Sequence, residues 1–410
     1  MKKAIIIAIS IILVLAIGYN IFQYTVKKIT EREIKRITQE EAGRITNEQI
    51  DKVTQSEIDR ITDEIVRQRT REITQKIFGG GSDTGKLKEV ECDNTPAKRQ
   101  FSNTLYYTGP LIDNHLHMPF TFEVSSAIYQ QADWDAPILE KEVAAGSIIC
   151  DFDKEKISSA FGFYAVPNLL KGQAVGPITQ IEQRYPGRII PFLMPAHVSG
   201  LDLKPDEAEE VLNSNKGLFR GYGEIALYRG SYKGISPDDP SLLEIYKIAD
   251  KHNLIVMMHP DGGQKQAFEK ILKENPSVKF LFHGENMWPW VTEIIGVYPN
   301  AYYSVDTGLF GVHNGHTTAN IYGSEKEEFV SDFTGNFDRI LKANAEVWGP
   351  RIEKHPDNYL WGTDRAYDWH FDADVGALLE EISRSFIGQL RPDVQEKFAY
   401  KNAQRLLQER

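Results

Sequence analysis

Two histidines that lie two positions apart are the first residues in the chain whose types and spacing suggest chemistry. His115 and His117 end the run LIDNHLH at residues 111–117. In a β-strand, side chains at positions i and i+2 point to the same face, so both imidazoles would converge at the end of the strand. Neutral imidazole is a frequent metal ligand. Because such a pair also occurs by chance, a metal site here requires further ligands from elsewhere in the chain.

Other candidate ligands also end β-rich runs of the sequence. They are Glu224 in GYGEIALY, His259 in LIVMMHPD, His283 in VKFLFHGEN and Asp364 in YLWGTDRA. Imidazole and carboxylate groups are the ligands that proteins use for zinc, iron, manganese and nickel. So many ligand-type residues at strand ends are not plausible as chance, and the sequence predicts one metal centre.

The elements that must position these residues alternate between strands and helices. The β-rich runs cover residues 111–117, 147–152 or 161–166, 189–195, 219–227, 254–259, 278–283, 301–306 and 358–363. Between them, LLEIYKIADKHN and AFEKILKENP have apolar residues three and four apart, which is typical of amphipathic helices. This alternation predicts an α/β protein, a (β/α)8 TIM barrel with insertions at 118–146 and 308–357. Such barrels carry their active sites at the carboxyl ends of the strands, where the candidate ligands fall.

The pattern of ligands resembles the amidohydrolase superfamily, and within it the amidohydrolase-related group. The resemblance covers roughly residues 105–410 and includes the H-x-H of the first strand and the closing helix KNAQRLL. It implies that His115, His117 and Asp364 bind a first divalent metal ion, with zinc expected.

The resemblance also implies that His259 and His283 bind a second metal ion. An acidic group on the fourth strand bridges the two ions in this superfamily, and many members carry a carboxylated lysine there. Glu224 stands at this position, as in TatD-like nucleases, whereas some related members hold a single ion. The expectation is one or two ions per chain, and Glu224 favours two.

The chemistry follows from these ligands. A bound metal lowers the pKa of water towards 7, and Asp364 would take the proton and pass it to the leaving group. In a site with one ion, His283 would polarise the substrate carbonyl. Arg365 is suited either to binding a substrate carboxylate or to a surface salt bridge. Trp288 in NMWPW is suited either to forming a wall for an apolar or aromatic substrate or to packing.

The expected function is hydrolysis of an ester, lactone or amide bond in a small-molecule substrate. The alternative is non-oxidative decarboxylation or hydration on the same ligands. A phosphoesterase and a membrane-tethered binding protein without catalysis are the lesser alternatives. The formal net charge of −11 argues against a nucleic-acid partner, since no basic surplus neutralises phosphates.

The two cysteines, Cys92 and Cys150, exclude a cysteine-based zinc site. They leave open one disulfide in an exported domain or two unrelated thiols.

The N-terminal residues predict a membrane anchor. Residues 4–22 carry no charge and would span about 28 Å as a helix, close to the thickness of the hydrocarbon core. We expect a retained single-pass anchor at residues 1–24, although Ala16-Ile17-Gly18 weakly matches a signal-peptide cleavage site. The lysine-rich leader favours an extracytoplasmic C-terminal domain, whereas the positive residues that follow the span favour a cytoplasmic one. We expect the extracytoplasmic side.

An eight-residue repeat that begins with ITEREIKR follows the predicted anchor. Its composition favours helix, and a repeat above 3.6 residues per turn favours a right-handed supercoil. Residues 25–78 therefore predict a helical stalk, either a coiled coil that forms a homo-oligomer or a solvated helix. The glycine-rich residues 79–86 predict a flexible linker, and residues 87–410 form the predicted catalytic barrel.

Overall fold

The structure is a computed structural model. It describes residues 90–93, 95, 99–101, 105–118, 143–168, 171–197, 201–310, 321–322 and 325–408. The predicted anchor at 1–24, stalk at 25–78 and linker at 79–86 lie outside these ranges, as does most of the insertion predicted at 118–146. Within these ranges, no helix is both long enough and apolar enough to cross a bilayer.

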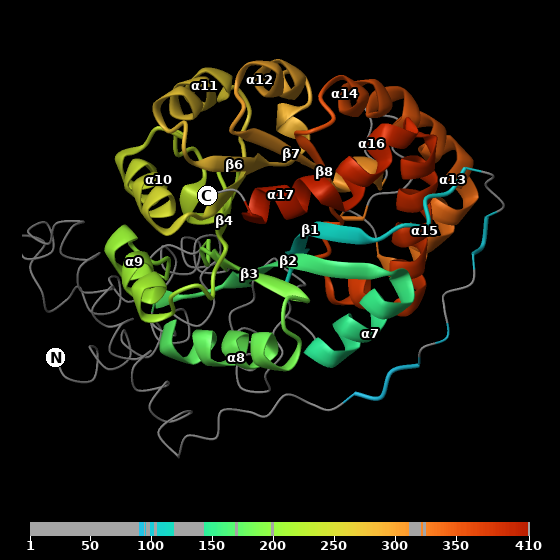
Figure 1. Cartoon of the computed structure of the whole chain (residues 1–410), viewed down its shortest axis with the longest axis horizontal. Coiled ribbons are helices and arrows are strands. Elements are labelled where there is room, and N and C mark those ends of the chain that lie inside the picture. Colours follow the sequence, from blue (N-terminus) through green and yellow to red (C-terminus); the bar gives the residue numbers. More distant parts are fainter. Residues whose placement is uncertain are drawn as a thin grey trace, which may run out of the picture.

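Eight parallel strands form one sheet, in the order β1 to β8, in the part of the chain that the structure describes. The strands are β1 Leu111–His117, β2 Ile157–Ala165, β3 Ile189–Met194, β4 Gly221–Ala226, β5 Ile255–His259, β6 Lys279–Phe282, β7 Ala301–Val305 and β8 Tyr359–Trp361. The last strand returns to the first: the His117 amide donates to the Arg365 carbonyl at 3.0 Å, and the Asp364 amide donates to the His115 carbonyl at 2.7 Å. The ring of strands lies inside a ring of helices, which confirms the predicted barrel (Figure 1).

The helices follow the strands in turn, and most of them lie around the outside of the barrel (Figure 1). They are α7 Ala145–Glu155, α8 Lys171–Arg184, α9 Pro205–Ser214, α10 Pro240–His252, α11 Lys265–Glu274, α12 Val291–Val297, α13 Lys326–Val347, α14 Gly349–Lys354, α15 Ala373–Gln389, α16 Pro392–Glu396 and α17 Asn402–Gln408. One of the two runs considered for the second strand, residues 147–152, is wrong because it lies in α7. Ile148 and Phe152 are one helical turn apart and both are buried, so this apolar run forms the inner face of a helix.

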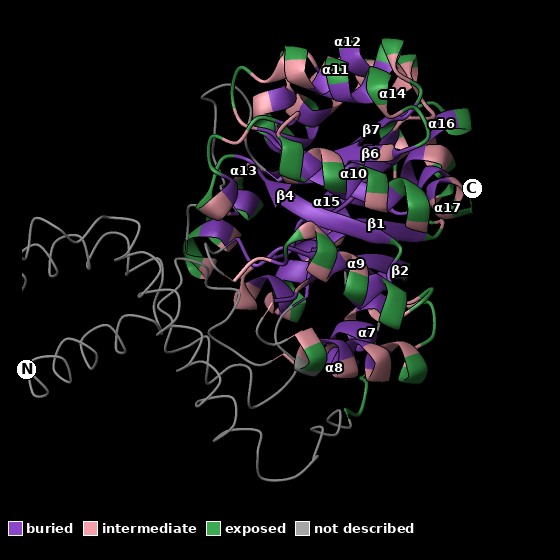
Figure 2. Cartoon of the chain, turned by 90° about the vertical axis from the view of Figure 1, so that its left-hand side faces the viewer, coloured by how far each residue is buried: buried purple, intermediate pink, exposed green. Residues whose placement is uncertain are grey.

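Apolar side chains fill the barrel in two separate clusters. The interior cluster takes alternate residues from the strands, such as Ile255 and Met257 of β5, and is closed at one end by Ala403 and Leu406 of α17. The outer cluster takes the intervening residues and packs them against the helices. Most strand residues are therefore buried, whereas the outer helices carry exposed faces (Figure 2). Membership of the interior cluster shows which residues of each strand face the inside of the barrel.

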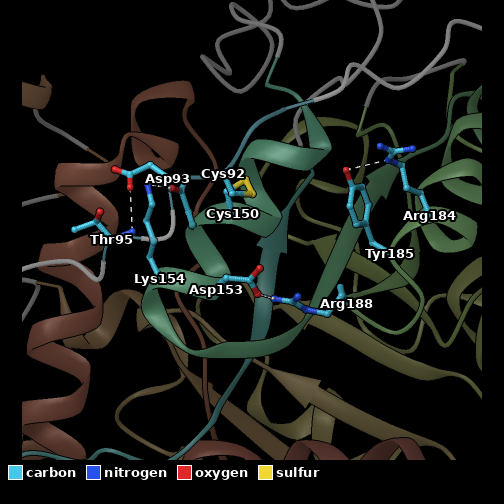
Figure 3. Close-up of a disulfide and its surroundings, with 10 residues drawn as sticks. Cys92, Asp93, Thr95, Cys150, Asp153, Lys154, Arg184, Tyr185 and Arg188 are labelled. Carbon is cyan, nitrogen blue, oxygen red and sulfur yellow. Dashed lines mark hydrogen bonds and ion pairs between the residues drawn. A yellow bond between two sulfur atoms is a disulfide. The ribbon is translucent and has the colours of Figure 1, made fainter.

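The segment before β1 is fastened to the outside of the barrel. Cys92 forms a disulfide with Cys150 of α7, with a Cα–Cα distance of 5.3 Å (Figure 3). The amides of Gln100 and Phe101 donate to the carboxylate of Glu381 in α15, at 2.7 and 2.8 Å. Of the two states that the sequence left open for the cysteines, the structure has the bridge.

Candidate metal centre

A β-bulge in β1 aims both of its histidines into the barrel. Between Asp113 and Leu116, β1 advances by three residues while the paired strand β2 advances by two. Ile112 lies in the interior cluster before the bulge, and Leu116 lies in the outer cluster after it. The extra residue thus moves the inward face from even to odd positions, so His115 and His117 point inward.

A second bulge does the same for Glu224 on β4. Between Tyr222 and Ile225, β4 advances by three residues while β5 advances by two. Tyr222 and Ile225 both pack in the outer cluster, so Glu224 faces the interior. Strict alternation would put Tyr222 on the same face as Glu224, but the bulge places Tyr222 on the outer face. Gly223 permits the bulge: its φ is +117°, and a Cβ there would lie 2.2 Å from the Met257 carbonyl oxygen.

One group of ligand-type atoms forms where β1, β4 and β8 end. Asp364 Oδ1 lies 3.3 Å from His115 Nε2 and 3.2 Å from His117 Nε2. The Nε2 atom of His117 also lies 3.3 Å from Glu224 Oε2. These contacts bring together the side chains that the sequence assigned to a first metal ion.

A second group forms around the other oxygen of Glu224. Glu224 Oε1 lies 2.8 Å from His283 Nε2 and 3.3 Å from His259 Nδ1. Gly284 makes room for this arrangement, since a Cβ at that position would lie 2.2 Å from the His259 ring. Glu224 therefore turns one oxygen to each group.

Asp306 is a further member of the centre that the sequence analysis did not single out. Its Oδ2 lies 2.9 Å from His115 Nδ1 and 3.5 Å from His283 Nδ1, and its Oδ1 accepts the Thr307 amide at 2.7 Å. A signal was present in the sequence, because the residue directly follows β7 and shares the inward parity of Tyr302. Asp306 faces the nitrogen of His115 that points away from Asp364, as an outer carboxylate that orients a ligand histidine does.

The electrostatics of the cluster call for positive charge at its centre. Burial lowers the pKa of His117, but Asp364 and Glu224 outweigh it and raise the pKa to about 9. Burial also lowers the pKa of His283, but Glu224 and Asp306 raise it to about 10. Burial raises the pKa of Asp364, but the neighbouring histidines lower it to about 2. The buried carboxylates therefore stay ionised, and protons on the neighbouring histidines compensate their charge. A divalent cation could supply the same compensation.

The side chains present fit such a cation. Three sets of ligand atoms lie within 4.8 Å of one another: His115, His117 and Glu224; Glu224, His259 and His283; and His115, His283, Asp306 and Asp364. Several buried nitrogens of these histidines make no hydrogen bond in the described part of the chain: His115 Nε2, His117 Nδ1, both His259 nitrogens and His283 Nδ1. All the candidate ligands named from the sequence are thus brought together, and several of their histidine nitrogens are free to bind a metal ion.

The two residues expected at the substrate have protein partners in the described structure. Arg365 is buried, and its Nη2 lies 2.6 Å from Glu155 Oε2. It forms neither an open carboxylate-binding group nor a surface salt bridge, because its guanidinium is used in a buried ion pair. Trp288 donates from Nε1 to the Tyr303 hydroxyl at 2.9 Å and packs edge-on to Trp348, with ring centroids 5.5 Å apart. The contacts of Trp288 are therefore those of a packing residue.

Three of the candidate ligands keep partial exposure to solvent, and the face that they form is the opening of the centre. The side chains of His117, His259 and Asp364 keep 10%, 11% and 9% of their surface exposed, whereas His115 and His283 keep 0% and 2%. A substrate would therefore approach the first three of these residues.

Tyr228 and Arg229, which follow β4, lie beside this opening. The Tyr228 ring lies against the His259 ring, with centroids 4.1 Å apart, and both Tyr228 and Arg229 are exposed.

With this geometry established, comparison with known proteins identifies the class of protein. A family model described as amidohydrolase (Amidohydro_2) matches residues 182–408, more than half of the chain. The chain belongs to the amidohydrolase family, which confirms the resemblance seen in its motifs. None of the curated proteins with which the chain was compared matches it.

The chain is also similar to several solved structures at low sequence identity. An uncharacterized TIM-barrel protein from Bordetella bronchiseptica is 20% identical, with 73% of this chain and 98% of that chain covered and a TM-score of 0.45. A 5-carboxyvanillate decarboxylase from Novosphingobium aromaticivorans, complexed with manganese, is 14% identical, with 75% and 99% covered and a TM-score of 0.44. Dihydroorotase from Campylobacter jejuni is 15% identical, with 76% and 87% covered and a TM-score of 0.44.

Proposed function

We propose that the chain is a metal-dependent hydrolase of an ester, lactone or amide bond in a small molecule. The observation that carries the proposal is the position of Glu224, whose two carboxylate oxygens face two separate groups of histidines. A buried carboxylate shared in this way suits a site for two divalent ions, with zinc as the expected metal. Bound metal would activate water and polarise the scissile carbonyl.

The residues of the chain would bind the metal ions and transfer the proton. His115, His117 and Asp364 would hold one ion, and His259 and His283 the other, with Glu224 between them. Asp364 is also the candidate proton acceptor. Its Oδ1 faces the β1 histidines, and its Oδ2 lies 4.0 Å from His283 Nδ1.

The Asp364 side chain is ionised at neutral pH and its backbone is fixed on both sides. The low pKa of about 2 results from neighbouring histidines that outweigh burial. The amide of Asp364 donates to the His115 carbonyl, and its carbonyl accepts the Tyr322 hydroxyl. A carboxylate held in this way is suited to take a proton from the attacking water and return it to the leaving group.

Non-oxidative decarboxylation or hydration is the second candidate function, since the same ligand set serves it. The observation that favours it is Arg229, an exposed cation beside the opening, because a decarboxylase must bind an acid.

Oxygen-isotope labelling separates the two candidates. The full chain, loaded with zinc or manganese, would be incubated in ¹⁸O-labelled water with a panel of lactones, esters, amides and aromatic acids. A hydrolase incorporates one labelled oxygen into the product carboxylate and releases no CO₂. Release of CO₂ without incorporation of label would favour the decarboxylase, and label added across a double bond would favour the hydratase.

The proposal places the barrel outside the cytoplasm, held at the membrane by residues 1–24. The Cys92–Cys150 disulfide supports this side, because such bridges persist in oxidising compartments. A membrane-impermeant biotinylation reagent added to intact cells should label lysines of the barrel. Labelling that requires lysis of the cells would contradict this location.

A further inference from the structure

We propose that Arg229 binds a carboxylate group of the substrate, so that the site selects small molecules carrying a negative charge beside the bond that reacts. The inference rests on the proposed function and names the substrate class of that same site. It assigns to Arg229 the role that the sequence analysis considered for Arg365.

The first argument concerns how the arginines are paired. The two fully buried arginines are both matched: Arg365 forms an ion pair with Glu155, and Arg384 forms one with Glu380. Arg229 is exposed, and no carboxylate within the described ranges lies at ion-pair distance from it. The Tyr228 hydroxyl lies close to this side chain, and the remaining N–H groups of the guanidinium can bind a planar anion.

The second argument concerns the backbone that carries the Arg229 side chain. Arg229 directly precedes the short 3-10 helix Gly230–Tyr232, and its amide donates to the Ala226 carbonyl at 3.3 Å. The next turn is fixed to the segment that follows β3, since the Ser231 amide donates to the His197 carbonyl at 3.3 Å. An anchored backbone limits the positions that the Arg229 side chain can take, which favours binding of a substrate in one orientation.

The third argument concerns the distance to the chemistry. Tyr228, the neighbour of Arg229, packs against the candidate ligand His259. Arg229 is the next residue along the chain, and both residues are exposed. The Arg229 side chain therefore starts one residue away from a ring that touches the centre.

The fourth argument concerns the charge of the centre itself. Glu224, Asp306 and Asp364 are three buried acidic residues, and they repel an approaching anion unless cations offset them. Bound metal would offset this charge at the reacting atoms. Arg229 would add positive charge at the rim and hold the substrate carboxylate there through charge-assisted hydrogen bonds.

The test compares two probes of similar shape, benzoate and benzyl alcohol, by calorimetric titration of the full chain loaded with zinc. Wild type should bind benzoate at least about tenfold more tightly than benzyl alcohol. In R229M the benzoate dissociation constant should rise at least about tenfold, as expected for loss of a charge-assisted contact. R229K should recover part of the loss. The affinity for benzyl alcohol should stay unchanged in both variants, which also shows that they fold.

K233M is the matched control, since Lys233 is an exposed cation on the same loop. It should bind benzoate as wild type does. Equal benzoate affinity in R229M and wild type, an equal loss in K233M, or no preference of wild type for benzoate would each overturn the inference.

The outcomes also separate this inference from the proposed function. If the chain hydrolyses none of the panel but benzoate binding depends on Arg229, the proposed function fails and the binding role stands. If the chain hydrolyses a member of the panel but R229M binds benzoate as wild type does, the proposed function stands and the binding role fails.

Discussion

Replacement of Asp306 by asparagine should weaken metal binding although Asp306 is not among the proposed ligands. The carboxylate uses both oxygens as acceptors, one for the Thr307 amide at 2.7 Å and one facing His115 Nδ1 at 2.9 Å. Asparagine has the same size but a single acceptor oxygen, so one of these two donors would face an NH₂ group. Loss of one hydrogen bond to a charged group costs about 1.5–3 kcal/mol.

This cost should be visible in the affinity for zinc, because Asp306 fixes which nitrogen of His115 carries the proton. Loss of such an outer partner typically weakens metal binding about 10–100-fold. The assay is competition between the full chain and a chromophoric zinc chelator at pH 7. D239N is the matched control, since Asp239 is a half-buried helix cap that accepts the Ser241 amide at 2.9 Å, away from the candidate ligands. An unchanged zinc affinity in D306N would refute the orienting role.

Three further predictions concern single features of the structure. H117A should lose metal and activity together, as measured by elemental analysis and turnover, and unchanged metal content would contradict the assignment of this ligand. Replacing Cys92 and Cys150 by serine should destabilise the barrel by about 4 kcal/mol, given the 58 residues that separate them, and chemical denaturation measures this. Burial lowers the pKa of His370 to about 3, so its neutral form stabilises the fold fully above pH 6.5 and this contribution is lost as the pH falls from 6.5 towards 3. Titration of the His370 ring signal by NMR should show no protonation near pH 6.5.

The barrel and the ligands at its strand ends were predictable because they depend on local patterns. The run predicted at 254–259 became β5 at Ile255–His259, and the predicted helix KNAQRLL became α17. His259 ends its strand on the inward face by simple alternation. Residues of this kind can be assigned from the period of the sequence alone.

Features that depend on irregular or distant structure were not predictable in the same way. The bulge at Gly223 reverses the face of β4, so strict alternation cannot place both Tyr222 and Glu224 on their observed faces. Arg365 follows a candidate ligand in sequence, but only the fold shows that its charge is matched by Glu155. Arg229 lies five residues after Glu224, and no motif distinguishes it from other surface arginines. Its role depends on which side of the centre is open.

The number of metal ions per chain tests the central claim most directly, because Glu224 is proposed to hold two ions between its two groups of histidines. Full-length protein would be saturated with zinc, freed of excess metal by gel filtration and analysed by inductively coupled plasma mass spectrometry. The account predicts about two equivalents in wild type and about one in E224Q, because the amide cannot bridge two cations as a carboxylate does. One equivalent in the saturated wild type, unchanged in E224Q, would contradict it.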